Sequence, residues 1–186
     1  MSITPERARA VLEAADRLYE QAELEAAMDR MAGEITRVLA DSDPLVITVM
    51  NGGLIPAGML LPRLRFPLQI DYLHATRYDG KTRGGELRWV ARPSCSLQGR
   101  TILLVDDIYD EGHTLAAIVR ACEAAGAARV CSAVMLDKQH TRKADYRPDF
   151  VGLPVVDRYV FGMGMDYCEY LRNLPGIYAV RDEDDA

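Results

Sequence analysis

The stretch ILLVDDIYDEGHTLAAIV at residues 102–119 constrains the fold of this chain most strongly. It begins with a short apolar run, continues with an acid-rich turn and ends with a second apolar run. The first run is apolar on both faces, which is typical of a strand buried inside a parallel sheet. The second run has the spacing of a helix that ends at Gly126. A buried strand followed at once by a helix predicts an α/β fold.

The same alternation of short apolar runs and helical segments continues along the chain. The pattern predicts helices from Pro5 to about Tyr19, from Leu24 to about Asp41, at 54–64 and at 113–126. It predicts strands at 45–50, 68–78, 99–107 and 128–137, and further short strands within 150–162 and 176–180. We therefore expect one domain over residues 1–186, built on a mostly parallel, doubly wound sheet flanked by helices.

In such a sheet, ligands bind beyond the carboxyl ends of the strands. Several loops follow predicted strands or lie close to their ends. We expect the functional site to be formed by the loops at 51–53, 106–114, 137–143 and 162–172.

The acid-rich turn has a chemical meaning of its own. Four carboxylates, those of Asp106, Asp107, Asp110 and Glu111, repel one another unless a ligand supplies cations or hydroxyl groups. The glycine and threonine that follow open a helix, whose free N–H groups form a cradle for an anion. A ribose 5-phosphate carries both a diol and a phosphate and fits this pattern. The alternative is an acidic first turn that only complements the helix dipole.

Residues 105–114, VDDIYDEGHT, resemble the motif with which type I phosphoribosyltransferases bind phosphoribosyl diphosphate (PRPP). Four further segments resemble the hypoxanthine-guanine branch of that family. They are VMNGGLIPAGML (49–60), DKQHTRK (137–143), RPDFVGLPVVDRYVFGMGMDY (147–167) and EYLRNLPGIYAV (169–180). The resemblance covers about residues 12–180 and is closest to bacterial hypoxanthine or hypoxanthine-guanine phosphoribosyltransferases. It implies a central parallel sheet with a small hood built from the N- and C-terminal parts.

The resemblance also implies a PRPP site. The residues that it assigns to PRPP are Asp106, Asp107, Glu111, Gly112, His113, Thr114, Asn51, Gly52 and Arg172. The two adjacent aspartates would hold the ribose hydroxyls, the four residues at the helix start would surround the 5-phosphate, and the last three would bind pyrophosphate. In this family the peptide bond of the pyrophosphate loop is often cis.

The purine and the metal would lie next to PRPP. The residues that the resemblance assigns to the purine are Lys138, Tyr159, Val160 and Asp166, with Asp110 as the catalytic acid or base at N7. Lys138 only donates hydrogen bonds, so it suits a 6-oxo group and leaves a 6-amino group unmatched. Mg²⁺ is the implied cofactor, held mainly indirectly by Asp106, Asp107 and Asp166.

A lid is expected because water must be excluded, or PRPP would be hydrolysed. The polar, glycine-rich region that begins at Arg77 and Tyr78 suits this role, and we expect a mobile active-site loop over residues 77–90. The acidic end of the chain, residues 181–186, is expected to be a frayed tail.

The net charge of −6 argues against a nucleic-acid partner bound through bulk positive charge. No apolar run reaches membrane-spanning length and no signal-peptide core is present, so we expect a cytoplasmic protein without membrane contact. The family implies a homo-oligomer, either a dimer or a tetramer. Two alternatives to hypoxanthine-guanine transfer remain at this point. One is a xanthine-preferring enzyme, and the other is a non-catalytic regulator of the same fold that binds PRPP or nucleotides.

Overall fold

A six-stranded sheet forms the centre of the protein, for which a computed structural model describes residues 3–77 and 87–181. The strand order is β4-β3-β2-β5-β6-β7, and every neighbouring pair is parallel except β3 with β4. The strands are β2 (Leu45–Val49), β3 (Gln69–Arg77), β4 (Leu87–Ala91), β5 (Thr101–Tyr109), β6 (Arg129–Lys138) and β7 (Phe150–Val155). The predicted mostly parallel sheet is confirmed.

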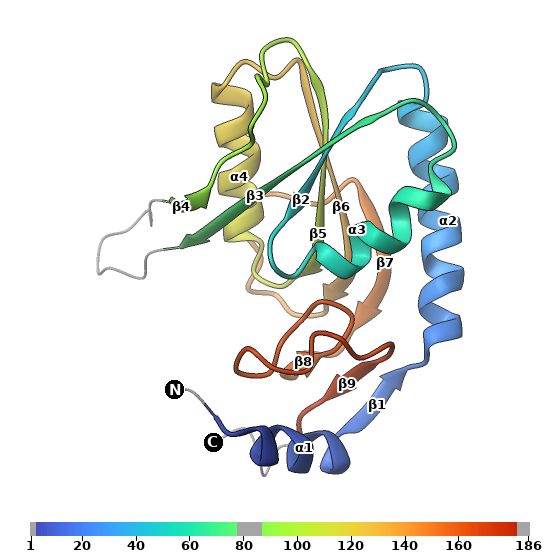
Figure 1. The fold of residues 1–186 in the computed structure, drawn as a ribbon, viewed down its shortest axis with the longest axis vertical. Helices are drawn as coiled ribbons and strands as arrows, with labels where there is room; N and C mark the ends of the chain where they lie inside the picture. Colours follow the sequence, from blue (N-terminus) through green and yellow to red (C-terminus); the bar gives the residue numbers. More distant parts are fainter. Residues whose placement is uncertain (1–2, 78–86, 182–186) are drawn as a thin grey trace.

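Helices cover both faces of this sheet (Figure 1). One face packs against α2 (Gln21–Leu39) and α3 (Leu54–Leu60), which continues into a short 3₁₀ turn, η1 (Leu61–Arg63). The other face packs against α4 (His113–Ala124). Alternate residues of β2 divide between the faces, with Val46 on the α2 side and Leu45 and Ile47 on the α4 side. Within the described residues, no helix is both long and apolar enough to cross a bilayer.

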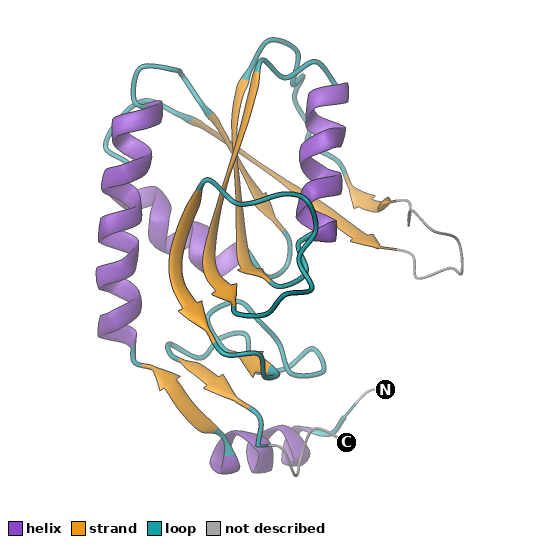
Figure 2. Cartoon of the chain, turned by 180° about the vertical axis from the view of Figure 1, so that it is seen from behind, coloured by secondary structure: helices purple, strands orange, loops and turns teal. Residues whose placement is uncertain are grey.

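A second, three-stranded antiparallel sheet lies beyond the carboxyl ends of β5, β6 and β7 (Figures 1 and 2). Its order is β1 (Asp16–Tyr19), β9 (Ile177–Ala179), β8 (Val160–Phe161), and α1 (Pro5–Ala14) lies beside it. Segments from the two ends of the chain therefore build one small layer opposite the strand ends. This is the hood that the sequence resemblance implies.

The predicted first helix is wrong at its end. It stops at Ala14, and Ala15 takes an extended conformation with φ −66° and ψ 150°. The next residues pair with β9, where Asp16 lies opposite Ala179 and Tyr19 opposite Ile177. The helical spacing of Leu18 and Tyr19 instead reflects their packing against the main core. A pairing partner 160 residues away overrides the local pattern.

The predicted lid and tail fall largely outside the description. Residue 77 ends β3, residues 87–90 belong to β4, and the two strands pair antiparallel. Tyr78 and the rest of the predicted 77–90 loop up to residue 86 lie outside the described residues, as do residues 182–186 of the predicted tail.

Candidate active site

The side chain of Tyr109 packs against the turn between β5 and α4. Its ring is buried, and its hydroxyl donates to the carbonyl of Tyr146. Gly112 lies directly against this ring, with φ +80°, and a Cβ added there would approach Cε2 of Tyr109 to 2.0 Å. Both the space and the left-handed backbone therefore require glycine. The first N–H groups of α4 open onto the surface beyond this glycine, as an anion cradle does.

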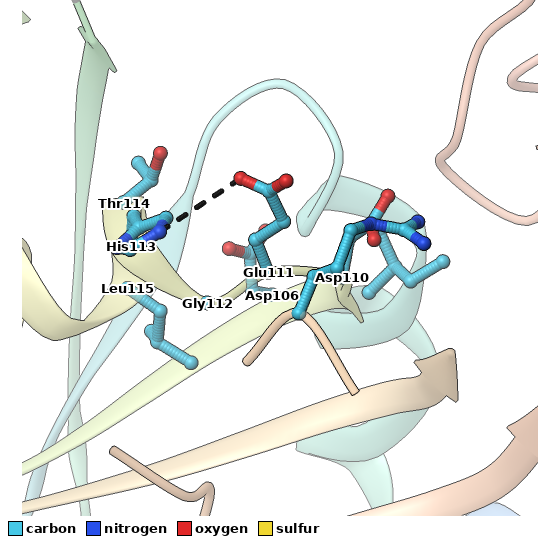
Figure 3. A pocket seen from close by; sticks show the side chains of 9 residues that line it. Asp106, Asp110, Glu111, Gly112, His113, Thr114 and Leu115 are labelled. Atoms are coloured by element: carbon cyan, nitrogen blue, oxygen red, sulfur yellow. Dashed lines mark ion pairs between the residues drawn. The ribbon is translucent and has the colours of Figure 1, made fainter. Parts of the chain in front are cut away.

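A cavity lies over this helix start (Figure 3). It is lined by Asp106, Ile108, Asp110, Glu111, Gly112, His113, Thr114, Leu115 and Arg142. The structure thus brings together all four residues that were predicted to surround a phosphate. Glu111 is turned toward His113, with Oε2 and Nε2 3.8 Å apart. Arg142 was not predicted, and its guanidinium makes two hydrogen bonds with Asp157, of 3.0 and 3.1 Å.

Asp106 and Asp107 lie side by side at the floor of the site. Burial and the negative charge of Asp107 raise the pKa of Asp106 well above its ordinary value. Burial also raises the pKa of Asp107, although hydrogen bonding and the charge of Arg172 partly offset it. The carboxylate of Asp106 accepts the backbone N–H of Asp107, and the carboxylate of Asp107 accepts the backbone N–H of Ile108. Hydroxyl donors or a cation would relieve this pair, as a ribose diol or a metal ion does.

The loop after β2 touches the same acids. A Cβ added to Gly52 would lie 2.0 Å from Oδ2 of Asp107, so the carboxylate rests on the loop backbone. A Cβ added to Gly164 would lie 2.0 Å from the carbonyl oxygen of Gly52, and Gly164 has φ +107°. The peptide bond between Met50 and Asn51 is cis, as the resemblance implied. The end of β5 and two loops that are distant from it in sequence therefore meet at Gly52.

Arg172 holds the loop that contains Gly164. Its Nη1 donates to the carbonyl of Gly164 at 2.8 Å, and its Nη2 lies 2.7 Å from Oδ1 of Asp166. The side chain of Arg172 is 26% exposed. The predicted pyrophosphate residues Asn51, Gly52 and Arg172 are consequently grouped around one point of the strand-end surface.

A second cavity adjoins the first. It is lined by Asp107, Ile108, Asp110, Lys138, Tyr159, Val160, Met165 and Asp166. All four residues predicted to contact a purine lie here, and Asp110 and Ile108 border both cavities. Tyr159 is 40% exposed, and its ring meets the edge of Tyr167 at a centroid distance of 5.6 Å. Such an exposed aromatic face can stack on a planar base.

Asp110 has a side-chain partner on each of its oxygens. Its Oδ2 lies 2.8 Å from Nζ of Lys138, and its Oδ1 lies 2.6 Å from Nε2 of His140. Burial raises the pKa of Asp110, but the hydrogen bonds from Lys138 and His140 outweigh burial and hold the pKa below its ordinary value. The carboxylate is therefore ionised at neutral pH, as a general base must be.

Sequence reasoning missed two further side chains that shape this acid, His140 and Lys143. Lys143 donates to the backbone carbonyls of Tyr109 and Asp110 at 2.9 and 2.7 Å and to Oδ1 of Asp137 at 2.9 Å. It also lies 4.1 Å from the centre of the Tyr109 ring. The only indication of His140 and Lys143 in the sequence was their position in the loop 137–143, which was predicted to border the site.

Metal ligands are sparse at the site. Across residues 3–77 and 87–181, no group of three or more His, Cys, Asp or Glu side chains is arranged to hold a metal ion. Asp106 and Asp107 supply two carboxylates, while Asp166 is already paired with Arg172. This donor set does not suit a metal enclosed by protein ligands. It suits a magnesium ion that takes most of its oxygens from substrate and water.

The family model for the phosphoribosyl transferase domain matches residues 14–168. Among characterised proteins, the chain is 34% identical over 161 residues to the hypoxanthine-guanine phosphoribosyltransferase of Bacillus subtilis, covering 86% of this chain and 89% of the relative. It is 30% identical over 166 residues to the hypoxanthine-guanine-xanthine phosphoribosyltransferase of Tritrichomonas foetus, covering 89% and 91%.

Solved structures agree on the fold. A crystal structure of a hypoxanthine phosphoribosyltransferase from Staphylococcus aureus superimposes with a TM-score of 0.89 and 24% sequence identity. The superposition covers 95% of this chain and 97% of the other.

Proposed function

The chain belongs to the phosphoribosyl transferase family, and we propose that it is the purine-salvage enzyme that joins hypoxanthine or guanine to PRPP, releasing pyrophosphate. The activity named for its relatives of 34% and 30% identity supports this proposal. So does the grouping of the residues that the sequence resemblance assigned to each part of the substrates.

One observation carries the proposal: two adjoining cavities share Asp110. One has the acid pair and the helix start that suit a ribose 5-phosphate. The other has a lysine and an exposed aromatic ring that suit a 6-oxopurine. A nucleotide 5-monophosphate has these two parts joined at one carbon, so a site for its synthesis needs both compartments with a proton acceptor between them.

The chemistry follows from this arrangement. The N9 atom of the purine forms a bond to the anomeric carbon of PRPP as the bond from that carbon to pyrophosphate breaks, and the bonding electrons leave with pyrophosphate. Asp110 would accept the proton that the purine loses, or stabilise the positive charge on the base while it forms. Arg172, together with the backbone at Gly52, would hold the departing pyrophosphate. Asp106 and Asp107 would accept hydrogen bonds from the ribose hydroxyls.

Magnesium fits this site as an ion held mainly by substrate oxygens. Asp106 and Asp107 would hold it through water, and Asp166 would reach it in the same way beside Arg172. When bound, the ion would neutralise negative charge on the departing pyrophosphate. The protein residues orient the two substrates around it.

Base selectivity would depend on Lys138. Its ammonium group has three donors and no acceptor, so a 6-oxo group pairs with it and a 6-amino group does not. Selection among hypoxanthine, guanine and xanthine depends on the 2-position, which would face the backbone near Val160. A product assay that includes xanthine measures this selectivity.

The experiment is a product assay with PRPP, Mg²⁺ and each of hypoxanthine, guanine, xanthine and adenine, with nucleotides separated by chromatography. We expect inosine or guanosine monophosphate and no adenosine monophosphate. Binding of PRPP without any nucleotide product would instead support the regulator of the same fold. The homo-oligomeric state and the cytoplasmic location stay predictions, to be tested by sedimentation and by cell fractionation.

A further inference from the structure

The side chain of His140 contacts Asp110, the acid that lines both cavities. His140 belongs to the irregular segment after β6, and its side chain is only 4% exposed. Its Nε2 is 2.6 Å from Oδ1 of Asp110. Its Nδ1 accepts the backbone N–H of Arg142 at 3.1 Å. Both ring nitrogens therefore have a partner, and the ring is held from two sides.

These two contacts assign the tautomer of the ring. A nitrogen that accepts a hydrogen bond from a backbone N–H carries no proton, so the proton of the neutral ring is on Nε2. His140 is then a donor to Oδ1 of Asp110.

Each oxygen of Asp110 thus already has one partner. His140 occupies Oδ1, and Lys138 occupies Oδ2 at 2.8 Å. Lys138 is the partner that we expect to move when the base binds. Lys138 has a long flexible side chain and a second destination at the 6-oxo group, whereas His140 is buried and fixed at its far nitrogen.

Resting on the proposed function, we infer that His140 is a positioning residue. It keeps Oδ1 of Asp110 fixed while Oδ2 is exchanged from Lys138 to the purine. The ammonium group of Lys138 leaves Oδ2, while His140 keeps its hydrogen bond to Oδ1. This remaining bond restrains rotation of the Asp110 carboxylate during the exchange. Orientation of this kind matters because displacements of about 1 Å at a reacting group can cost roughly 100-fold in rate.

Within the described part of the chain, the basic groups that act on Asp110 come from β6 and the segment after it. Lys138 approaches from β6, and His140 and Arg142 approach from the segment after it, while Lys143 contacts the backbone carbonyl. Removing the donor of His140 leaves the hydrogen bond from Lys138 and the more distant charge of Arg142 to favour the ionised carboxylate. The pKa of Asp110 would then rise, and the acid limb of the kcat/KM profile would move to higher pH.

Three variants test this role. His140→Gln can place an amide donor near the position of Nε2, whereas His140→Asn places its amide near Nδ1, and His140→Leu has no donor. We expect His140→Asn and His140→Leu to lower kcat by roughly 10- to 100-fold with the KM for PRPP little changed, and to move the acid limb upward. His140→Gln should stay close to the wild-type enzyme in both respects. If His140 only filled space, the activities of the Gln and Asn variants would not differ in this way.

The ring itself gives a readout that does not depend on activity. Nitrogen-15 NMR of the unliganded protein should show the Nε2–H tautomer of His140, and a proton on Nδ1 would overturn the inference. Wild-type-like rates and an unmoved acid limb in all three variants would also overturn it. So would a Gln variant as impaired as the Asn variant. A wild-type protein that turns over none of the purines would instead refute the proposed function, and with it the need for this residue.

Discussion

The ammonium group of Lys138 and the carboxylate of Asp110 lie 2.8 Å apart at the boundary between the two cavities. Each is the partner that the other would exchange for a purine atom, with the 6-oxo group replacing Asp110 and N7 replacing Lys138. In this arrangement each group satisfies the charge of the other. Base binding would therefore open an ion pair rather than occupy free groups.

Lys138→Met should remove the donor to the 6-oxo group while preserving the length of the side chain. We expect kcat/KM for hypoxanthine to fall by roughly 10- to 150-fold, because a hydrogen bond to a charged group contributes about 1.5–3 kcal/mol. The dissociation constant of PRPP, measured by calorimetry, should hardly change. Gln139→Ala is the adjacent control and should behave like the wild type. Undiminished use of hypoxanthine by Lys138→Met would refute the role of this lysine.

Asp110→Asn replaces the proposed base with a group of the same shape. Turnover should fall by roughly 100- to 10,000-fold, which is the usual contribution of general acid–base catalysis. PRPP affinity should be nearly intact, since the acid pair and the helix start are unaltered. Steady-state rates and calorimetry measure the two quantities separately. Rates at the wild-type level in this variant would contradict the assignment.

Gly112→Ala and Gly99→Ala form a matched pair, because both glycines have a left-handed backbone, with φ +80° and +70°. A Cβ at Gly99 would meet nothing within 4 Å, whereas one at Gly112 would strike the ring of Tyr109. Gly99→Ala should lower the free energy of unfolding by about 1–2 kcal/mol through backbone strain alone. Gly112→Ala should lower it by a further ~1–3 kcal/mol from overpacking. Urea denaturation measures both, and equal losses would exclude the contact with Tyr109.

Asp106→Asn should stabilise the free protein and weaken its binding of PRPP. The raised pKa of Asp106 means that ionisation costs more in the folded protein than in the unfolded chain. Above that raised pKa the carboxylate lowers stability, and the effect disappears as the pH falls below the ordinary aspartate range, where both states are protonated. We expect a gain of about 0.5–2 kcal/mol at pH 8 that shrinks toward pH 3. The exposed Asp145→Asn is the control, and a loss of stability at pH 8 would contradict this account.

Structural features formed by residues adjacent in the sequence were predicted well, whereas contacts between distant residues were not. The turn from β5 into α4 was predictable because strand, acids, glycine and helix are adjacent in the chain. The family resemblance assigned residues to two substrates. Those assigned to the 5-phosphate and to the purine line two adjoining cavities, and those assigned to pyrophosphate lie together around Gly52.

The missed features all depend on residues far apart in sequence. β1 forms because β9 lies beside it, although residues 16–19 continue a helical spacing. The contact between His140 and Asp110 joins positions 30 residues apart, and nothing in the local pattern of His140 indicates an acid partner. Gly52 meets Gly164 for a reason visible only in three dimensions, because the carbonyl of Gly52 occupies the space that a side chain at position 164 would need.

The most direct test is a crystal structure of the protein with inosine monophosphate, pyrophosphate and Mg²⁺. The account predicts the 5-phosphate at the start of α4 and the base between Tyr159 and Lys138. The ammonium group of Lys138 should have moved from Asp110 to the 6-oxo group, while His140 still contacts Oδ1. A nucleotide bound elsewhere, or a base in this cavity with the Lys138–Asp110 pair still closed, would contradict the account.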